Sequence, residues 1–300
     1  MSMSILVRSV RCGQRALVLA LLALAGGCSN AGPGAAGRFA VELENLELRV
    51  GGTIGVYAVD TGSGRELEWR ADERFAMAST FKALLAAVVL AEADAGRLSL
   101  DQRISLEGVQ LVTYSPVVEQ YVSSGGMTLR ELCEAAVTLS DNTAANLLLE
   151  QTGGPEAFTD FLRRSGDDVT RLDRWEPELN ENARGDERDT STPRAYAMSL
   201  NRVLFSDVLS DASRAELENW LVANRTGDAR VRAGLPSGWR VGDKTGTGAN
   251  AAVNDVAVFW PPERSPVVIA IFMSWSDEEI TTLSAVHAYI AALAAELLIE

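Results

Sequence analysis

Ser79 and Lys82 form the first pair of side chains in this sequence whose types and spacing suggest catalysis. They lie in an apolar stretch, residues 75–91, in which Lys82 is the only charged residue. A spacing of three places both side chains on one face of a helix. Burial lowers the pKa of a lysine toward the range of a general base, and a helix N-terminus offers N–H groups to an oxyanion. The pair therefore predicts an activated serine nucleophile. The alternative is a core helix whose lysine extends to water.

Three further polar stretches carry side chains that suit catalysis or anion binding. The Ser-Asp-Asn stretch 140–142 lies between two predicted helices, where an N-cap alone would explain it. The Lys-Thr-Gly stretch 244–246 ends a predicted strand, and its lysine and hydroxyl suit an anion or a charged sheet edge. Glu176 lies in the long aperiodic segment 171–190, which is either a functional loop or a solvated turn.

The elements that must position these residues follow from hydrophobic periodicity and turn signals. After Ser79 begins the buried helix, further helices are predicted at 38–50, 128–139, 142–151, 155–164, 193–205, 211–223 and 278–298, and strands at 53–60, 65–70, 239–245, 254–260 and 267–275. Thr128 and Glu131 have the spacing of a capping box. Because the strands form hairpins without crossover helices, the sheet is predicted to be antiparallel. The expected fold class is α/β (α+β): about five strands flanked by N- and C-terminal helices, with an inserted all-helical subdomain.

The chain is expected to be one domain preceded by an export signal. Three arginines precede the apolar run 16–25 and a group of small residues, which predicts a signal peptide over residues 1–27. Cys28 then resembles the lipid-bearing cysteine of bacterial lipoproteins, and ordinary cleavage nearby is the alternative. Residues 28–37 are predicted as a flexible tether. The α/β part takes about residues 38–75 and 224–300, and the all-α part about 76–223. We expect an exported protein, either periplasmic or anchored to the membrane as a lipoprotein.

Composition excludes several classes of function. The formal net charge of −14 argues against nucleic-acid binding. With Cys12 in the leader and Cys28 assigned to lipid, Cys133 is alone, so we expect no disulfide framework and a small buried hydrophobe at this position. The only histidine, His287, is distant in sequence from every other candidate, so a Ser-His-Asp triad has little support and a histidine zinc site is excluded. The base is therefore expected to be a lysine or a carboxylate.

In chain order, Ser-x-x-Lys, Ser-Asp-Asn, a loop glutamate and Lys-Thr-Gly form the signature of class A β-lactamases and penicillin-binding proteins. From about Arg38 to the C-terminal helix, the chain resembles a class A serine β-lactamase, including the stretches 130–146 and 186–190. The resemblance implies hydrolysis of the β-lactam ring of penicillin- and cephalosporin-type antibiotics, and so resistance to them. It also implies a monomer that uses no cofactor and no metal.

The resemblance also implies a role for each motif. Ser79 would attack the lactam carbonyl, with the N–H groups of Ser79 and Thr247 as oxyanion hole. Lys82, or Glu176 through a water, would take the hydroxyl proton, and Ser140 would protonate the leaving nitrogen. Glu176 would then activate the water that releases the acyl group. The implied substrate-binding residues are Asn142, Lys244, Thr245, Gly246, Thr247, Tyr114, Asn180 and Arg230.

Features of the 171–190 loop extend the resemblance. The family has a cis bond at the position of Glu176-Pro177, an ion pair at the positions of Arg174 and Asp189, and a hydrogen-bonding anchor at the position of Asn146.

Two departures from the family pattern carry expectations. Val253 stands where an arginine usually meets the substrate carboxylate, and Arg230 matches a position from which some members supply that group instead. Ala78 and Gly248 stand where class A carbapenemases have a disulfide, so the resemblance does not suggest carbapenem turnover.

Two other classes of protein are compatible with parts of this pattern. A low-molecular-weight penicillin-binding protein shares the serine, lysine and Lys-Thr-Gly, but such proteins lack a deacylating carboxylate at the place of Glu176. A penicillin-sensing receptor domain would need a membrane span that joins it to a signalling module, and we expect no such span in this sequence. A comparison of burst and turnover with a chromogenic cephalosporin separates the enzyme from both.

Overall fold

The computed structural model describes residues 34–299, so the predicted signal peptide, the predicted lipid anchor Cys28 and the start of the tether lie outside the described residues. Its centre is a five-stranded antiparallel sheet with the strand order β2-β1-β9-β8-β7, as the hairpin connections predicted. These strands are β1 (Thr53–Asp60), β2 (Glu66–Trp69), β7 (Arg240–Thr247), β8 (Val253–Trp260) and β9 (Val267–Ser274). The strand that carries Lys-Thr-Gly is therefore an edge strand.

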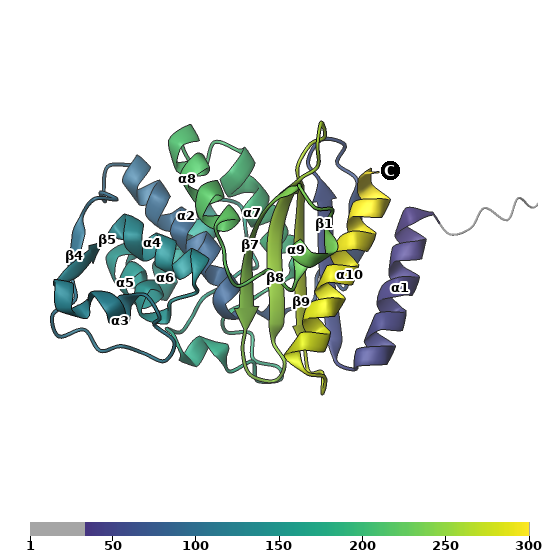
Figure 1. Ribbon diagram of the computed structural model, residues 1–300, viewed down its shortest axis with the longest axis horizontal. Helices are drawn as coiled ribbons and strands as arrows, with labels where there is room; N and C mark the ends of the chain where they lie inside the picture. The colour runs from purple at the N-terminus through teal and green to yellow at the C-terminus, as the bar shows by residue number, and fades with distance from the viewer. Residues whose placement is uncertain (1–33, 300) are drawn as a thin grey trace, which may run out of the picture. The chain divides into compact units, whose positions relative to one another are not determined.

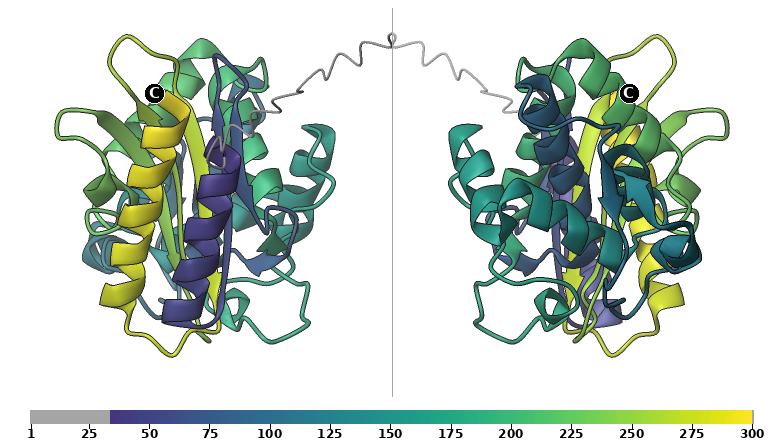
Figure 2. Two further views of the ribbon diagram at one scale, coloured as in Figure 1. Left: turned by 90° about the vertical axis from the view of Figure 1, so that its right-hand side faces the viewer. Right: turned by 90° about the vertical axis from the view of Figure 1, so that its left-hand side faces the viewer.

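The sheet separates two hydrophobic layers. Helices α1 (Ala35–Val50) and α10 (Ile280–Ile299) lie side by side along one face, at the purple and yellow ends of the colour scale (Figures 1 and 2). The short helix α9 (Val231–Gly234) packs against α10 on the same face, and the other helices cover the opposite face or extend from it. Every residue of β9 is buried, because apolar side chains cover the strand on both sides.

The helical part contains the remaining long helices. These are α2 (Phe81–Asp94), α4 (Leu129–Thr138), α5 (Asn142–Thr152), α6 (Gly154–Arg164), α7 (Pro193–Phe205) and α8 (Asp211–Val222), with the short α3 (Val118–Tyr121). At the start of α4 the predicted capping box is present, because Thr128 and Glu131 each bond to the other's backbone N–H. Cys133 is buried in this helix, as expected, and forms no disulfide within residues 34–299.

Helix α2 is the element around which the helical part packs. Every residue from Phe81 to Leu90 is buried, and the helix contacts α4, α5, α7 and α8 (Figure 1). A helix that is apolar on all sides can be stable only when it is enclosed in this way. The helix predicted from Ser79 is present, but its first turn, Ala78–Thr80, is a 3₁₀ turn called η1, and the Ser79 side chain does not cap it.

Several short elements lack a sequence signal and were not predicted. β3 (Phe75–Ala76) pairs with β6 (Thr190–Ser191), and β4 (Arg103–Ser105) pairs with β5 (Gly126–Thr128). Pairings of two or three residues are too short to show a period in sequence. One prediction is also corrected: residues 35–37, expected to end the tether, form the first turn of α1, because alanines favour helix and Gly34 precedes them.

Of the helices in residues 34–299, α10 alone is long and apolar enough to cross a membrane, although no such segment was expected from the sequence. Half of its twenty residues are buried, among them Leu283, Ile290 and Leu298 in the layer that it shares with α1 and the sheet. Because the core helix of a soluble protein passes the same test of length and composition, this property by itself does not indicate a membrane span.

Candidate active site

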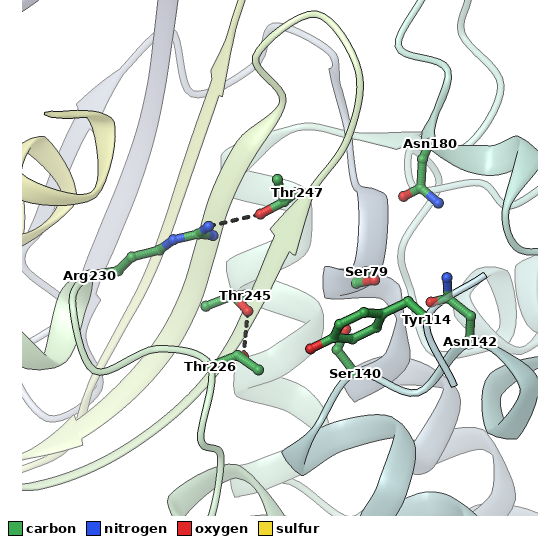
Figure 3. Close-up of a pocket in the computed structure, with 9 residues that line it drawn as sticks. All are labelled: Ser79, Tyr114, Ser140, Asn142, Asn180, Thr226, Arg230, Thr245 and Thr247. Atoms are coloured by element: carbon green, nitrogen blue, oxygen red, sulfur yellow. Dashed lines mark hydrogen bonds between the residues drawn. The ribbon is translucent and has the colours of Figure 1, made fainter. Parts of the chain in front are cut away.

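The turn η1 and the start of α2 bring Ser79 and Lys82 together as their spacing predicted. Lys82 Nζ donates to Ser79 Oγ at 2.9 Å, and the lysine side chain is completely buried. Ser79 is half-buried and opens onto the cavity shown in Figure 3. The hydroxyl therefore has a buried amine on one side and space for a ligand on the other.

Lys82 is surrounded by oxygen acceptors from three parts of the chain. Its Nζ also donates to the backbone carbonyl of Ser140 at 2.8 Å and to Asn142 Oδ1 at 2.5 Å, and it lies 2.9 Å from Glu176 Oε1. Burial lowers the pKa of Lys82, and the Glu176 carboxylate opposes part of that decrease. The alternative in which Lys82 extends to water is wrong, because the amine is enclosed.

The Ser-Asp-Asn stretch serves both as a cap and as a wall of the site. Asp141 caps α5 by accepting the N–H of Ala144 at 2.8 Å, which is the structural role that the sequence left open. Ser140 has a left-handed backbone with φ of 60°, and its Oγ lies 3.5 Å from Lys82 Nζ. Asn142 completes the stretch by donating its amide to the carbonyl of Thr113 at 2.8 Å. The turn at residues 140–142 therefore caps α5 and also places the polar side chains of Ser140 and Asn142 at the cavity.

Strand β7 supplies the second lysine. Lys244 Nζ donates to Ser140 Oγ at 3.1 Å, so Ser140 lies between two amines. Burial and the neighbouring Lys82 lower the pKa of Lys244 to about 7. Gly246 allows β7 to lie close to the segment that leads into η1, because a Cβ at this position would lie 2.6 Å from the carbonyl oxygen of Met77.

Arg230 reaches the same strand from the loop before α9. Its guanidinium donates to the carbonyls of Gly246 and Asn254 and to Thr247 Oγ1, the last at 2.8 Å (Figure 3). Burial lowers the pKa of Arg230, and nearby buried carboxylates partly compensate. Val253 is buried in the apolar layer, so it presents no polar group to the cavity.

Thr226 is a lining residue that the sequence analysis missed. Its Oγ1 lies 2.6 Å from Thr245 Oγ1, and both hydroxyls face the cavity (Figure 3). No sequence motif contains Thr226. It lies in the connection after α8, and only the course of this loop in the folded protein brings it to the site. Its place four residues before Arg230 was the only available signal.

The 171–190 loop places Glu176 under Ser79. Glu176 is buried, and its Oε1 accepts from Ser79 Oγ at 3.4 Å. The Glu176-Pro177 bond is cis, and Asn146 exchanges two hydrogen bonds with the backbone of Glu176, at 2.9 and 3.0 Å, as predicted. At the neck of the loop, Arg174 forms the predicted ion pair with Asp189 at 2.5 Å.

Asn180 holds the other oxygen of that carboxylate. Its Nδ2 donates to Glu176 Oε2 at 2.5 Å and to the carbonyl of Pro177 at 3.0 Å. Within residues 34–299 the buried Asn180 Oδ1 accepts no hydrogen bond. A buried acceptor of this kind beside a carboxylate suits a water molecule that donates to both.

All twelve predicted site residues thus meet in one place. The cavity of about 350 Å³ is lined by Ser79, Tyr114, Ser140, Asn142, Asn180, Thr226, Arg230, Thr245 and Thr247. Lys82, Glu176, Lys244 and Gly246 lie beneath these residues and contact them. His287 is buried in α10, across the sheet from α2, and has no part in this cluster.

The two positions of the family's carbapenemase disulfide are adjacent in the structure. A Cβ on Gly248 would lie 3.5 Å from the Cβ of Ala78, so the positions have the spacing of a disulfide without its cysteines.

The chain matches known proteins over most of its length. The sequence profile of the β-lactamase enzyme family matches residues 38–298. Beta-lactamase FAR-1 of Nocardia farcinica is 52% identical over 79% of this chain and 75% of its own length. A carbapenem-hydrolysing β-lactamase, KPC, of Klebsiella oxytoca is 47% identical over 84% of this chain and 86% of its own length.

The fold also matches solved structures. An ancestral class A β-lactamase is 57% identical, with a TM-score of 0.84 over 86% of this chain and 99% of that structure. Agreement in sequence and in fold covers the motifs and the elements that position them. The chain therefore belongs to the class A β-lactamase family and is a β-lactam-hydrolysing enzyme.

Proposed function

We propose that this enzyme opens the β-lactam ring of penicillins and cephalosporins through an acyl-enzyme on Ser79, which water activated by Glu176 then hydrolyses. The observation that carries the proposal is the triangle of Ser79 Oγ, Lys82 Nζ and Glu176 Oε1, whose sides are 2.9, 2.9 and 3.4 Å. In this triangle the Ser79 hydroxyl has two buried basic groups beside it, Lys82 for acylation and Glu176 for deacylation.

In acylation, Lys82 is the direct proton acceptor. The Ser140 carbonyl and Asn142 Oδ1 can only accept hydrogen bonds from Lys82, so they take two N–H groups of a neutral amine and leave its lone pair for Ser79. The bond from Ser79 Oγ to the lactam carbonyl carbon forms as the proton moves to Lys82 Nζ. Ser140 Oγ, between Lys82 and Lys244, gives its proton to the ring nitrogen as the C–N bond breaks and takes the proton that Lys82 Nζ had accepted, so that Lys82 and Ser140 both end neutral.

The oxyanion of the tetrahedral intermediate is bound by the N–H groups of Ser79 and Thr247. Gly248 N–H donates across the sheet to Ala252 at 2.8 Å. Because alternate N–H groups of a strand point to opposite edges, the Thr247 N–H points to the open edge of β7, which η1 contacts. The Ser79 N–H lies in the first turn of a helix, where donors lack helical partners.

In deacylation, Glu176 removes a proton from a water molecule that attacks the acyl carbon, and it passes that proton to Ser79 Oγ, 3.4 Å away, as the bond between the acyl carbon and Ser79 Oγ breaks. Asn180 supports this role in two ways, because its amide N–H holds Glu176 Oε2 and its unused Oδ1 accepts from the same water. This step distinguishes a hydrolase from a penicillin-binding protein that stays acylated.

Arg230 is the proposed partner of the substrate carboxylate, together with the hydroxyls of Thr245 and Thr226. Replacing Arg230 by alanine is expected to raise KM for benzylpenicillin, lowering kcat/KM roughly tenfold to a hundredfold for a lost charge-assisted contact. Adding Val253→Arg is expected to restore part of the loss, because the side chain removed from position 230 leaves space beside β8. Steady-state kinetics of both variants test this, and an unchanged kcat/KM in Arg230→Ala would place the carboxylate elsewhere.

Lys244 makes capture of the anionic substrate dependent on pH. Since its pKa in the free enzyme is about 7, its positive charge is present below that pH and is lost as the pH rises through it. We expect kcat/KM to fall above about pH 7, by at most about tenfold per pH unit. Lys244→Arg keeps its charge at every pH, so its profile should lack this decrease. A parent and a variant whose profiles fall at the same pH would contradict the assignment.

The test of the proposed function is turnover of a chromogenic cephalosporin by the purified protein. Many product molecules per enzyme support hydrolysis, whereas a single burst without turnover would support a penicillin-binding protein.

The proposal does not include carbapenem turnover, because Ala78 and Gly248 stand where the disulfide of class A carbapenemases would be. The KPC relative is named for carbapenem hydrolysis. Export through residues 1–27, with or without lipid on Cys28, is part of the proposal, and mass spectrometry of the mature N-terminus tests it.

A further inference from the structure

A buried tyrosine contacts the turn that carries the nucleophile. Tyr196 lies near the start of α7, and its hydroxyl donates to the backbone carbonyl of Thr80 at 2.6 Å. Thr80 directly follows Ser79 and is the last residue of η1. The Tyr196 side chain is completely buried, and burial raises the pKa of its hydroxyl, so the hydroxyl stays a neutral donor over the working pH range. This bond therefore joins α7 to the backbone beside the nucleophile.

The ring of the same tyrosine packs against the main sheet. Tyr196 meets Phe272 of β9 edge to face, with ring centroids 5.7 Å apart and an angle of 65° between the planes. Phe272 also stacks with Phe75, which lies in β3 just before η1, with centroids 6.1 Å apart. Aromatic pairs of this geometry are favourable, and a buried ring in a close-packed core keeps one rotamer. Tyr196 is therefore a rigid connection between the sheet and η1.

The backbone that leads to Ser79 is strained. Ala78 has a left-handed φ of 44°, which is costly for a residue with a Cβ. Such a conformation persists only where the surrounding contacts enforce it. Asn254 of β8 supplies two of these contacts, because its amide donates to the carbonyls of residues 76 and 77 at 2.9 and 3.1 Å. The Tyr196 hydroxyl supplies a contact on the other side of Ser79.

We infer that Tyr196 is a positioning residue that holds the Ser79 N–H at its place in the oxyanion hole. The inference rests on the proposed function. The two N–H groups of that hole belong to separate elements, Ser79 in η1 and Thr247 in β7. The Tyr196 ring is fixed to the sheet that contains β7 through Phe272, and its hydroxyl is fixed to η1. The distance between the two N–H groups therefore depends on this tyrosine.

Tyr196→Phe removes only the hydroxyl and keeps the ring. The Thr80 carbonyl keeps a partner, because Thr80 precedes the first residue of α2 and its carbonyl accepts the first bond of that helix. The variant is therefore expected to fold, with η1 less firmly held.

This change is expected to slow both halves of the reaction by the same factor. Since the oxyanion hole stabilises the tetrahedral intermediates of acylation and of deacylation, both rate constants decrease. KM then stays nearly constant, because it depends on the ratio of these two rate constants and on substrate capture by Arg230 and β7, which the variant leaves in place. We expect kcat and kcat/KM for benzylpenicillin to fall together by roughly threefold to tenfold, as for the loss of one hydrogen bond.

Tyr57→Phe is the matched control. Tyr57 is a buried tyrosine of β1 in the same apolar layer, and its hydroxyl donates to Met198 Sδ at 3.8 Å, away from η1. Steady-state kinetics and a thermal melt are measured for the parent and both variants.

A spectroscopic measurement separates a role in the oxyanion hole from a role in the fold alone. Each change is also made in Glu176→Gln, in which the acyl group is expected to stay on Ser79, and the stretching frequency of the acyl carbonyl is measured by infrared difference spectroscopy. Only acylated molecules contribute to this band, so it reports the hydrogen bonds to the acyl carbonyl and not the folded fraction. Weaker hydrogen bonds from the oxyanion hole move the band to higher frequency.

Equal decreases of kcat and kcat/KM in Tyr196→Phe, with a band at higher frequency and neither change in Tyr57→Phe, support the inference. An unchanged kcat in Tyr196→Phe overturns it, and so does an equal decrease in Tyr57→Phe. A lower kcat with an unmoved band, or a Tyr196→Phe protein that does not fold, also overturns it, because the hydroxyl would then serve only the fold. If Glu176→Gln forms no adduct, the kinetic comparison alone decides. A parent without penicillin turnover contradicts the proposed function itself, whereas an active parent matched by Tyr196→Phe contradicts only the inference.

Discussion

Ser79→Ala is expected to abolish hydrolysis of every β-lactam while the protein stays folded. In an enzyme whose nucleophile and base act as a unit, loss of the nucleophile removes about six orders of magnitude from kcat. The structural cost is small, because Ser79 does not cap η1 and the variant loses a hydrogen bond from Lys82 worth about 1 kcal/mol. Hydrolysis of benzylpenicillin and mass spectrometry of the protein after incubation measure both parts of the expectation.

The parent should show a transient penicilloyl adduct, and Ser79→Ala should show none. Ser124→Ala is a matched control, because Ser124 is exposed in the 122–124 turn and its hydroxyl donates to the carbonyl of Tyr121 at 2.8 Å, away from the cavity. It is expected to retain the parent's activity. Substantial turnover by Ser79→Ala would show that another group carries the acyl intermediate, or that none forms.

Glu176→Gln is expected to acylate and then stall. The Glu176 carboxylate raises the pKa of Lys82, so its removal leaves Lys82 more readily neutral and still able to accept the proton of Ser79. Deacylation loses its general base, which typically contributes about a hundredfold to ten-thousandfold in rate. The measurement is a stoichiometric burst of product followed by a long-lived adduct on Ser79, observed by stopped-flow absorbance and mass spectrometry.

Glu178→Gln is the control for Glu176→Gln, because Glu178 is an exposed residue of the same loop, and it should turn over like the parent. Rapid steady turnover by Glu176→Gln would contradict its role in deacylation. A folded variant that forms no adduct would instead show that Glu176 also serves as the base in acylation. Circular dichroism and a thermal melt separate that outcome from collapse of the loop.

Local sequence patterns were sufficient for most of the fold. Residues 81–90 are apolar on every face of a helix, so only a central position could stabilise them, and α2 occupies that position. The capping box at Thr128 and Glu131 and the strands of the main sheet also followed from short-range signals. These features depend on contacts within a few residues or on a period of two or 3.6, which a single sequence displays.

The short pairings and some of the boundaries could not be obtained in this way. The two-residue strands β3 and β6 pair across more than a hundred residues, and nothing in either pair of residues distinguishes it from a loop. Thr226 likewise has no local signature, and only the path of the chain after α8 brings it to Thr245. Such features depend on where packing places separate segments.

The sequence by itself determined which chemical groups this protein has: a serine three residues before a lysine, a Ser-Asp-Asn turn, a loop glutamate and a Lys-Thr-Gly strand. Only the tertiary structure decided how they meet. Lys82 and Ser140 are 58 residues apart and Lys244 and Ser140 are 104 apart, yet each amine lies within 3.5 Å of the Ser140 hydroxyl. The physical reason is burial: packing of α2 among the helices and of η1 against the edge strand removes both lysines from water, which lowers their pKa values and brings them to one cavity.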